Sequence, residues 1–404
     1  MRASAACLLL LVSLPGGSAA AQALPEGPLR TTDGQLVVTG EVVGTIGSAD
    51  ETSFFNYTDY EHNALRMFRV SLAGIWRPSD WLALVGEVRS EDLDQASAYA
   101  AYVRVRPWQK HPFDIQAGRI PPVFGAFSRR TYNADNPLIG YPLAYQYLTS
   151  LRSDAIAAWP DDLLRMRGRG WQSSFPVGDP VAKPGMPLAS VFRWDTGVQA
   201  RWAARAIELS GGVTTGTLGD PRVSDNNDGK QLAARVAVRP AVGLSLGASA
   251  SRGAWLARSI TDILPPAAAS RAYDQIAFGA DAEYSRDYWV VRGEMIWSRW
   301  TLPLLQLGHD QTLDATGIWV EGRYRLTPRV FVAARVDHLG FSTITGTLFP
   351  EPTTWDAPVD RIEVGGGYYL QRNLVARAVV QHNRRDGGRV QSKTFLSAQL
   401  AYWF

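Results

Sequence analysis

The sequence contains one cysteine, Cys7, among its 404 residues. Cys7 lies within the first 23 residues, which we expect to be cleaved off, so the mature chain would contain no cysteine. This excludes disulfide bridges, thiolate metal sites and a cysteine nucleophile. It suits a chain that enters an oxidising compartment, where unneeded thiols form wrong disulfides.

Strong net charge, clustered histidines and long hydrophobic runs are also absent. The formal charge is +3, too small to indicate a nucleic-acid partner. The five histidines lack the spacing of metal ligands, so we expect neither a metal site nor a cofactor. No nucleophile motif is present, and we do not expect an enzyme. Beyond residue 23 no segment approaches the ~20 apolar residues of a membrane-spanning helix, which leaves a soluble β-protein or a membrane β-barrel.

Residues 1–23 have the layout of a secretory signal peptide. Arg2 supplies the positive charge, and the segment from Leu8 to Leu14 is largely apolar but is about half as long as the ~20 residues of a membrane anchor. Alanines from Ala19 to Ala23 provide the small residues that signal peptidase requires. We therefore expect residues 1–23 to be removed and residues 24–404 to form one domain.

The C-terminus alternates between apolar and mixed side chains. Phe404, Tyr402 and Leu400 fall on one face of an extended strand, and the pattern continues through Ala398 and Leu396. An apolar strand face that ends in aromatic residues suits a lipid interface. A terminal aromatic after alternating apolar residues is also typical of the signal by which outer-membrane barrels are recognised for assembly. We therefore predict a bacterial outer-membrane location, with lipid and the barrel assembly machinery as partners.

The same period of two recurs upstream, with charges confined to one side of each strand. Ile362 and Val364 share one face of a strand, and Arg361 and Glu363 share the other. We predict an all-β fold, a transmembrane antiparallel β-barrel of about 16 strands with both ends of the domain on the periplasmic side. Fourteen or eighteen strands stay open as alternatives. The expected strands begin near Gln35, Ala64, Trp81, Ala98, Phe113, Phe192, Ala206, Gln231, Gly243, Asp274, Tyr288, Leu313, Val330, Arg361, Leu374 and Thr394.

Short turns and long polar segments alternate between these strands, as in outer-membrane barrels. The longest segment without clean alternation, about residues 120–190, is the third long loop. A loop of this length is uncommon unless it has a function. Residues 155–166 within it could hold a short helix. The third loop of general porins folds into the barrel and narrows the pore, and we expect the same here.

The start of this loop, from Gln116 to Gly125, contains glycine, arginine, two prolines, phenylalanine and glycine in that order. It resembles the corresponding stretch of the phosphate-selective porin O and P family, with Val123 as an extra residue before Phe124. The resemblance implies a trimeric barrel that passes small anions. The family's lysine cluster has no counterpart among the four lysines of this chain, so phosphate specificity does not follow.

The candidate selectivity residues are arginines of the third loop and of the nearby wall. A ring of arginines lowers the entry barrier for anions if binding stays weak enough for release. We therefore expect passive diffusion of small hydrophilic solutes with a weak preference for anions. Asp161 and Asp162 would form the opposing face of a transverse field. The predicted basic residues are Arg129, Arg130, Arg165, Arg167 and Arg169 of the loop and Arg104 and Arg106 of the wall.

Three alternatives stay open. Inward charges could pair across neighbouring strands and leave little net field. The barrel could serve adhesion or structure and conduct nothing. Aromatic residues of the third loop could stack sugar rings, or could only pack the loop against the wall. These aromatic residues are Tyr141, Tyr145, Tyr147, Trp159, Trp171 and Phe175.

Overall fold

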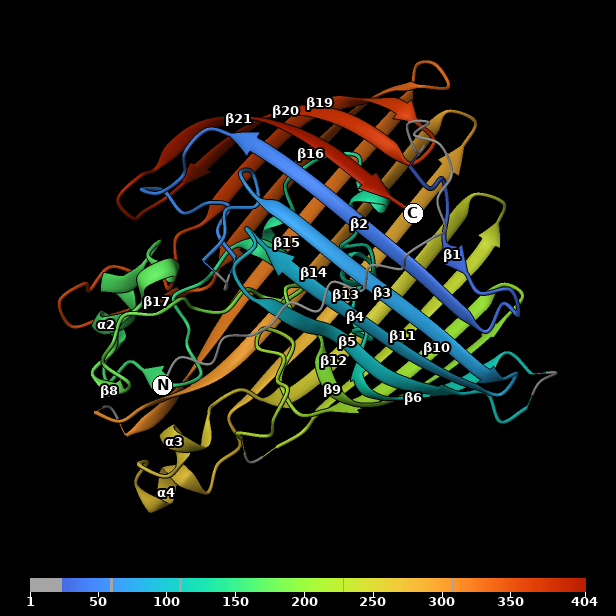
Figure 1. Ribbon diagram of the computed structural model, residues 1–404. Coiled ribbons are helices and arrows are strands. Elements are labelled where there is room, and N and C mark those ends of the chain that lie inside the picture. The colour runs from blue at the N-terminus through green and yellow to red at the C-terminus, as the bar shows by residue number, and fades with distance from the viewer. Residues whose placement is uncertain (1–23, 59–60, 109–110, 228, 307) are drawn as a thin grey trace, which may run out of the picture.

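The computed structural model describes residues 24–58, 61–108, 111–227, 229–306 and 308–404. The predicted signal peptide, residues 1–23, lies outside the described residues. The main sheet has 17 strands, of which the two-residue strand β1 (Leu29–Arg30) only borders β2. The other sixteen form a closed antiparallel barrel in which β21 pairs with β2 (Figure 1). No helix in the described part of the chain is long and apolar enough to span a bilayer.

The barrel strands follow one another around the ring in chain order. They are β2 (Leu36–Gly47), β3 (Phe68–Ser79), β4 (Leu82–Glu91), β5 (Ala96–Val105), β6 (Phe113–Ile120), β9 (Asp195–Ala204), β10 (Ile207–Thr214), β11 (Gln231–Ala241), β12 (Leu244–Ala254), β13 (Asp274–Arg286), β14 (Trp289–Leu304), β15 (His309–Arg325), β16 (Val330–Phe341), β19 (Val359–Gln371), β20 (Leu374–Arg385) and β21 (Ser392–Trp403). Within the described residues, the loops hold four short α-helices, α1 (Leu143–Gln146), α2 (Pro160–Met166), α3 (Arg258–Thr261) and α4 (Pro266–Ala269). They also hold two small hairpins, β7 (Ala155–Ile156) with β8 (Val177–Gly178) and β17 (Thr343–Ile344) with β18 (Thr353–Thr354).

The predicted all-β barrel of sixteen strands is confirmed. Each predicted strand start lies within four residues of an observed one. The count stayed open because residues 120–190 lack clean alternation. This segment adds no strand to the barrel, because β7 and β8 pair only with each other.

The strands are apolar on their outer face and polar on their inner face, the reverse of a soluble protein. On β16, Val332 and Val336 are 44% and 55% exposed, whereas Arg335 and Asp337 between and beside them are each 1% exposed. An apolar exterior around a polar interior is the pattern of a membrane-spanning barrel. Four exposed tryptophans, Trp76, Trp81, Trp202 and Trp289, lie near one end of the strands, where an aromatic girdle is expected.

The two ends of the barrel differ in their connections. At one end, here called the turn end, strands are joined by tight turns such as Arg205-Ala206 and Asp287-Tyr288. Arg205 and Asp287 have φ of 42° and 52°, the left-handed conformation that two-residue hairpin turns require. The other end, here called the loop end, carries loop 1 (residues 48–67), loop 3 (121–194), loop 5 (255–273), loop 7 (342–358) and loop 8 (386–391).

The C-terminal residue closes the barrel seam. Phe404 and Gly40 exchange two backbone hydrogen bonds, of 3.1 and 3.0 Å. The Phe404 ring covers Gly40, where a Cβ atom would lie 2.5 Å from the Cε1 atom of the ring. Glycine at this position lets the terminal aromatic lie flat on the outer face of β2.

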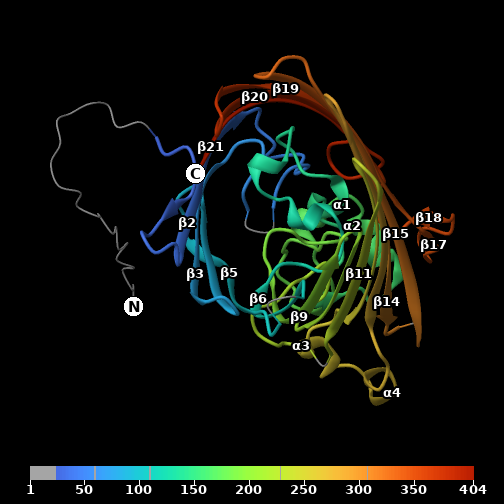
Figure 2. The same ribbon diagram turned by 90° about the vertical axis from the view of Figure 1, so that its right-hand side faces the viewer.

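Loop 3 runs inside the barrel, as predicted (Figure 2). Every residue from Asn136 to Ala158 is buried except Asp154, which is half-buried. Helix α1 packs so closely on the wall that a Cβ atom on Gly317 of β15 would lie 2.7 Å from the Cβ of Ala144. The core therefore lies between loop 3 and the inner wall, and loop 3 decides which part of the lumen stays open.

Candidate functional site

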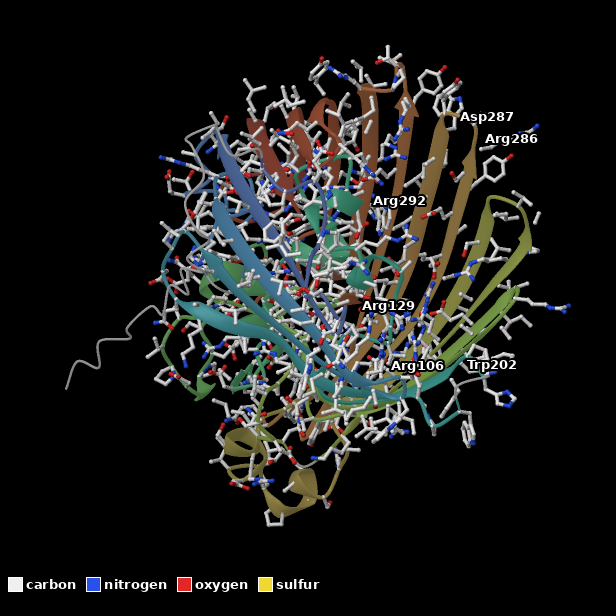
Figure 3. The ribbon with its side chains drawn as sticks, turned by 45° about the vertical axis from the view of Figure 1, so that its right-hand side comes forward. Arg106, Arg129, Trp202, Arg286, Asp287 and Arg292 are labelled. Atoms are coloured by element: carbon white, nitrogen blue, oxygen red, sulfur yellow. The ribbon has the colours of Figure 1, made fainter. Side chains whose placement is uncertain are left out.

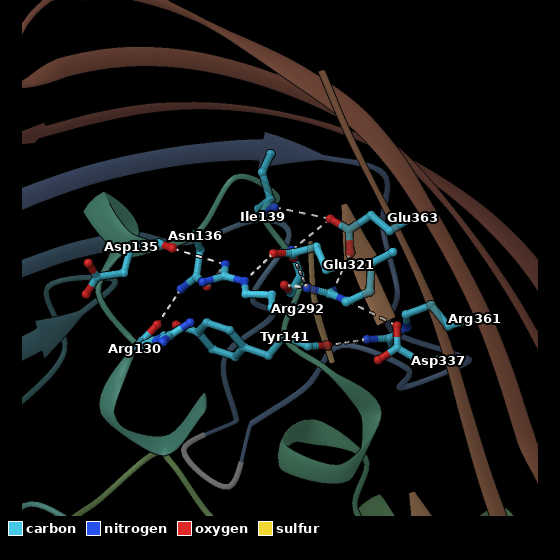
Figure 4. Close-up of polar contacts among 12 residues, drawn as sticks. Arg130, Asp135, Asn136, Ile139, Tyr141, Arg292, Glu321, Asp337, Arg361 and Glu363 are labelled. Atoms are coloured by element: carbon cyan, nitrogen blue, oxygen red, sulfur yellow. Dashed lines mark hydrogen bonds and ion pairs between the residues drawn. The ribbon is translucent and has the colours of Figure 1, made fainter. Parts of the chain in front are cut away.

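Buried carboxylates of the wall hold the backbone of loop 3. Glu363 on β19 accepts hydrogen bonds from the backbone N–H groups of Ile139 and Gly140, at 3.1 and 2.9 Å (Figure 4). Asp337 on β16 accepts one from Leu143 at 3.1 Å. A side chain at Gly140 would collide with the Glu363 carboxylate, so glycine is required for this close approach.

Arginines of the same wall neutralise these carboxylates. Arg335 lies 2.8 Å from Glu363, 3.1 Å from Asp337 and 3.3 Å from Glu321, and it also donates to the carbonyl of Gly140 at 2.9 Å. Arg292 pairs with Glu321 at 2.7 Å. These five residues of β14 to β19 are thus paired and buried, as the alternative of pairing across neighbouring strands held.

Two further carboxylates hold loop 3, one on β14 and one on β2. Glu294 on β14 accepts from the N–H groups of Ala126 and Phe127, at 2.9 and 3.4 Å. Glu41 on β2 accepts from the backbone and side-chain nitrogens of Asn133, at 2.8 and 3.0 Å. Loop 3 is therefore hydrogen-bonded to β14, β16, β19 and β2, and we call the part of it inside the barrel the loop 3 partition.

An open part of the lumen lies between the loop 3 partition and the turn end. A cavity of about 620 Å³ there is lined by loop 3, by β2 to β4 and by the N-terminal segment. Its acidic lining residues are Glu26, Glu41, Glu87 and Asp135. Burial raises the pKa of Asp135, although Arg130 and Arg292 oppose this effect.

Arginines gather around one carboxylate on the other side of this lumen. Glu208 on β10 lies 3.0 Å from Arg129 of loop 3, 3.0 Å from Arg201 of β9 and 3.7 Å from Arg239 of β11. The side chains of Arg201 and Arg239 are 41% and 57% exposed, whereas that of Glu208 is 12% exposed. Three guanidinium groups on one carboxylate leave a net positive charge that faces the lumen.

Further arginines extend this positive region along the wall. Arg104 on β5 lies within electrostatic range of Arg77 and Arg106. Among the residues that the structure describes, Arg104 and Arg106 form no ion pair. Arg106 and Arg129 can be located in Figure 3. We call the whole set the arginine crescent. It consists of Arg77, Arg104, Arg106, Arg129, Arg201 and Arg239.

The structure separates the predicted selectivity residues into a group inside the lumen and a group at the loop end. Arg104, Arg106 and Arg129 lie in the crescent, and Arg130 lies beyond it in an ion pair with Glu283 of β13. The other five lie at the loop end, where Arg167 donates to Thr354 Oγ1 of loop 7 at 2.8 Å. This second group consists of Arg165, Arg167, Arg169, Asp161 and Asp162.

Asp161 and Asp162 do not face the arginines across the lumen. Asp161 accepts hydrogen bonds from three consecutive N–H groups of loop 7, residues 347 to 349. Asp162 accepts from the N–H groups of Ala158 and Trp159, both at 3.0 Å, and so caps α2. The carboxylates nearest to the crescent are Glu208 and Asp114 instead.

The loop aromatics mainly fill space. Tyr141, Tyr145, Tyr147 and Phe175 are buried in the core between loop 3 and the wall. Trp159 is exposed and Trp171 stacks on Phe54 of loop 1 at a centroid distance of 5.6 Å.

Several functional groups were not identified from the sequence. The period of two put charged residues such as Glu363 on one face of each strand. Nothing in it assigned Glu363, Asp337 or Glu294 to hold loop 3. Arg77 has the same parity as the inward-facing Arg69 of its strand, and this signal was available in the sequence.

Comparison with protein-family models and with curated proteins finds no match. The structure is similar to the anion-selective porin from Comamonas acidovorans, with a TM-score of 0.58, 10% identity, and 91% of this chain and 99% of that chain covered. It is also similar to OmpT, an outer membrane protein of Vibrio cholerae (TM-score 0.56, 11% identity, 93% and 99% covered), and to Salmonella typhi OmpF in complex with daunomycin (0.55, 11%, 94% and 100%). At these identities the likeness shows the fold, which is that of the bacterial porins.

Proposed function

We propose that this protein is an outer-membrane porin through which small hydrophilic solutes diffuse passively, with a weak preference for anions. The observation that carries the proposal is the arginine crescent, whose guanidinium groups outnumber the carboxylates beside them. A positive wall lowers the entry barrier for an anion, and exposed arginines release it again. The structural similarity to a porin that is itself anion-selective, the one from Comamonas acidovorans, is consistent with this proposal.

The proposed orientation follows from the two ends of the barrel. The turn end, with both termini of residues 24–404, would face the periplasm, and the loop end would face outward. Residues 1–23 would act as the signal peptide and Phe404, Tyr402 and Leu400 as the assembly signal. A homotrimer, as in the phosphate-selective porin O and P family that residues 116–125 resemble, is part of the proposal.

The partition formed by loop 3 predicts a narrow pore. Apolar side chains and paired charges occupy the lumen between the partition and β14 to β19. Solutes must therefore pass along the remaining wall, close to the crescent. We expect a small single-channel conductance and exclusion of large solutes.

Reversal potentials across planar bilayers under a potassium chloride gradient test the proposal. The purified protein should show a modest chloride preference, which Arg104→Gln with Arg106→Gln should reduce. Arg286→Gln, at an exposed turn-end position with 74% exposure, is the matched control and should change nothing (Figure 3). Cation preference would contradict the selectivity, and a folded protein without conductance would instead support a barrel that serves adhesion or structure.

A further inference from the structure

A second, smaller cavity lies at the loop end between loops 1, 3 and 8. Its volume is about 80 Å³. It lies apart from the arginine crescent, because its lining residues come from the loops and from the loop end of β20. The residues that matter here are Phe54, Tyr147, Arg169, Trp171, Arg385 and Arg389.

Arg385 is a buried cation without a direct counter-ion. It is 5% exposed, and its guanidinium donates to the carbonyl groups of Gly387 and Val390, at 3.2 and 2.9 Å. Among the residues that the structure describes, no carboxylate pairs with it. The centroid of the Phe55 ring lies 4.6 Å from the guanidinium carbon of Arg385 and, with the two carbonyls, the ring partly offsets its burial. A buried cation that lacks a carboxylate partner still favours an anion beside it.

The nearby carboxylates are engaged elsewhere. Asp356 lies within electrostatic range of Arg385, but it accepts hydrogen bonds from the backbone N–H groups of Ser150 and Gly168, at 2.7 and 2.8 Å. Asp386 is 81% exposed and lies 3.7 Å from Arg167. Neither carboxylate forms an ion pair with Arg385 among the residues described.

Tyr147 contributes an unused donor. Its side chain is buried, with 3% exposure, and its hydroxyl oxygen lies beside the Arg385 guanidinium, which can only donate to it. The O–H proton has no acceptor among the described residues. A buried hydroxyl normally uses its proton in a hydrogen bond, so the Tyr147 hydroxyl is placed to donate to a ligand that also contacts Arg385. Arg169 and Arg389 are exposed at the mouth, and neither forms an ion pair within the described ranges.

Another wall of the cavity is aromatic. Phe54 and Trp171 stack with an interplanar angle of 17°, and Tyr57 packs edge-on against Trp171 at 5.0 Å. Phe54 has φ of 53°, a conformation that a bulky residue rarely adopts and that tends to occur at functional sites. This wall offers a flat apolar surface beside a cationic one.

We infer that this cavity binds a small organic carboxylate from the outer side of the barrel. The carboxylate would accept hydrogen bonds from Arg385 and Tyr147, since the planar guanidinium fork matches a carboxylate better than a spherical ion. The apolar part of the ligand would rest on Phe54 and Trp171. Binding at this site requires no conduction, so this inference can be tested independently of the proposed porin function.

Titration of the purified full-length barrel in detergent with benzoate tests the inference. We expect saturable binding in calorimetry, accompanied by a change in tryptophan fluorescence that Trp171→Leu abolishes. Arg385→Gln should weaken benzoate binding at least about tenfold, because it removes charge-assisted hydrogen bonds. Arg384→Gln, the adjacent exposed position, is the matched control and should bind as the unaltered protein does.

Benzyl alcohol, which has the ring but no carboxylate, should bind weakly or not at all. The inference is overturned if benzoate does not saturate, if benzyl alcohol binds equally well, or if folded Arg385→Gln binds benzoate unchanged. Should Arg385→Gln fail to fold, the exposed substitution Arg389→Gln replaces it and must weaken benzoate binding several-fold. Unchanged affinity in that variant would also overturn the inference.

Discussion

Glu363 illustrates how one buried carboxylate can position a loop. It is fully buried, accepts hydrogen bonds from the backbone of residues 139 and 140, and pairs with Arg335. Such a group is stable inside the barrel only because both kinds of partner are present. Its loss would leave Arg335 short of a counter-charge and two backbone donors unpaired.

We expect Glu363→Ala to lower the free energy of unfolding by about 3–5 kcal/mol and to loosen loop 3. Single-channel recordings should then show larger or more variable conductance, and chemical unfolding should show the lost stability. Glu363→Gln keeps one acceptor, so its stability and conductance should be intermediate between those of the unaltered protein and Glu363→Ala. A Glu363→Ala barrel with unaltered stability and conductance would show that Glu363 does not position the loop.

The ionisation of Asp161 should make the contact between loop 3 and loop 7 depend on pH. Burial opposes its ionisation, but the N–H donors of residues 347 to 349 outweigh burial and lower the pKa of Asp161 below its usual value of 3.8. The charged carboxylate therefore stabilises the contact fully above that usual value, and the contribution is lost as pH falls through the lowered pKa.

Since Cys7 is the only cysteine, a spin label on Leu348→Cys would report this contact specifically. The label should be immobile at neutral pH and mobile well below the usual pKa of the carboxyl group. In Asp161→Ala it should be mobile at both. A label in the parent protein that stays immobile in acid would refute the assignment.

At the scale of elements, the pairing of β21 with β2 is accompanied by a contact between glycine and an aromatic ring. The Phe404 ring occupies the space that a side chain at Gly40 would need. We expect Gly40→Val to displace the ring and Phe404→Ala to remove it, and both to reduce the yield of assembled barrel several-fold. Heat-modifiable mobility on gels measures assembled barrel directly. Gly44→Val on the same strand, where a Cβ atom meets nothing within 4 Å, is the control and should assemble normally.

The arginines of loop 3 lie in two different parts of the barrel. Its first part, near Arg129 and Arg130, faces the lumen, whereas residues 160–169 reach the loop end and contact loop 7. A single loop thus contributes to both the crescent and the 80 Å³ cavity.

At the scale of the whole molecule, charge is distributed unevenly around the barrel. The strands from β14 to β19 carry a buried cluster of paired charges around Arg335, whereas the crescent carries partly exposed arginines in excess. Buried pairs stabilise the structure only while both partners are present, and exposed arginines contribute little to stability. Selectivity and stability should therefore be separable by position.

We expect Arg201→Gln with Arg239→Gln to remove most of the chloride preference and to change the unfolding free energy by less than about 1 kcal/mol. Arg335→Gln should instead cost about 3–5 kcal/mol and leave the reversal potential nearly unchanged. Salt-gradient recordings and chemical unfolding on the same preparations measure both quantities. If Arg335→Gln altered selectivity more than the double substitution, the crescent would not be the selectivity element.

The sequence by itself determined the barrel, because side-chain alternation along a strand is a local property with a fixed period. It also located the third loop, since a long break in alternation is visible without knowing any partner. The sequence did not determine where individual charges lie within the lumen. Arg335 and Glu363 lie 28 residues apart and meet through strand register, whereas Asp161 and Arg129 share a loop and end in different places. Only the tertiary structure decided which arginines are neutralised, because pairing depends on distances across strands and on the path of loop 3 through the lumen.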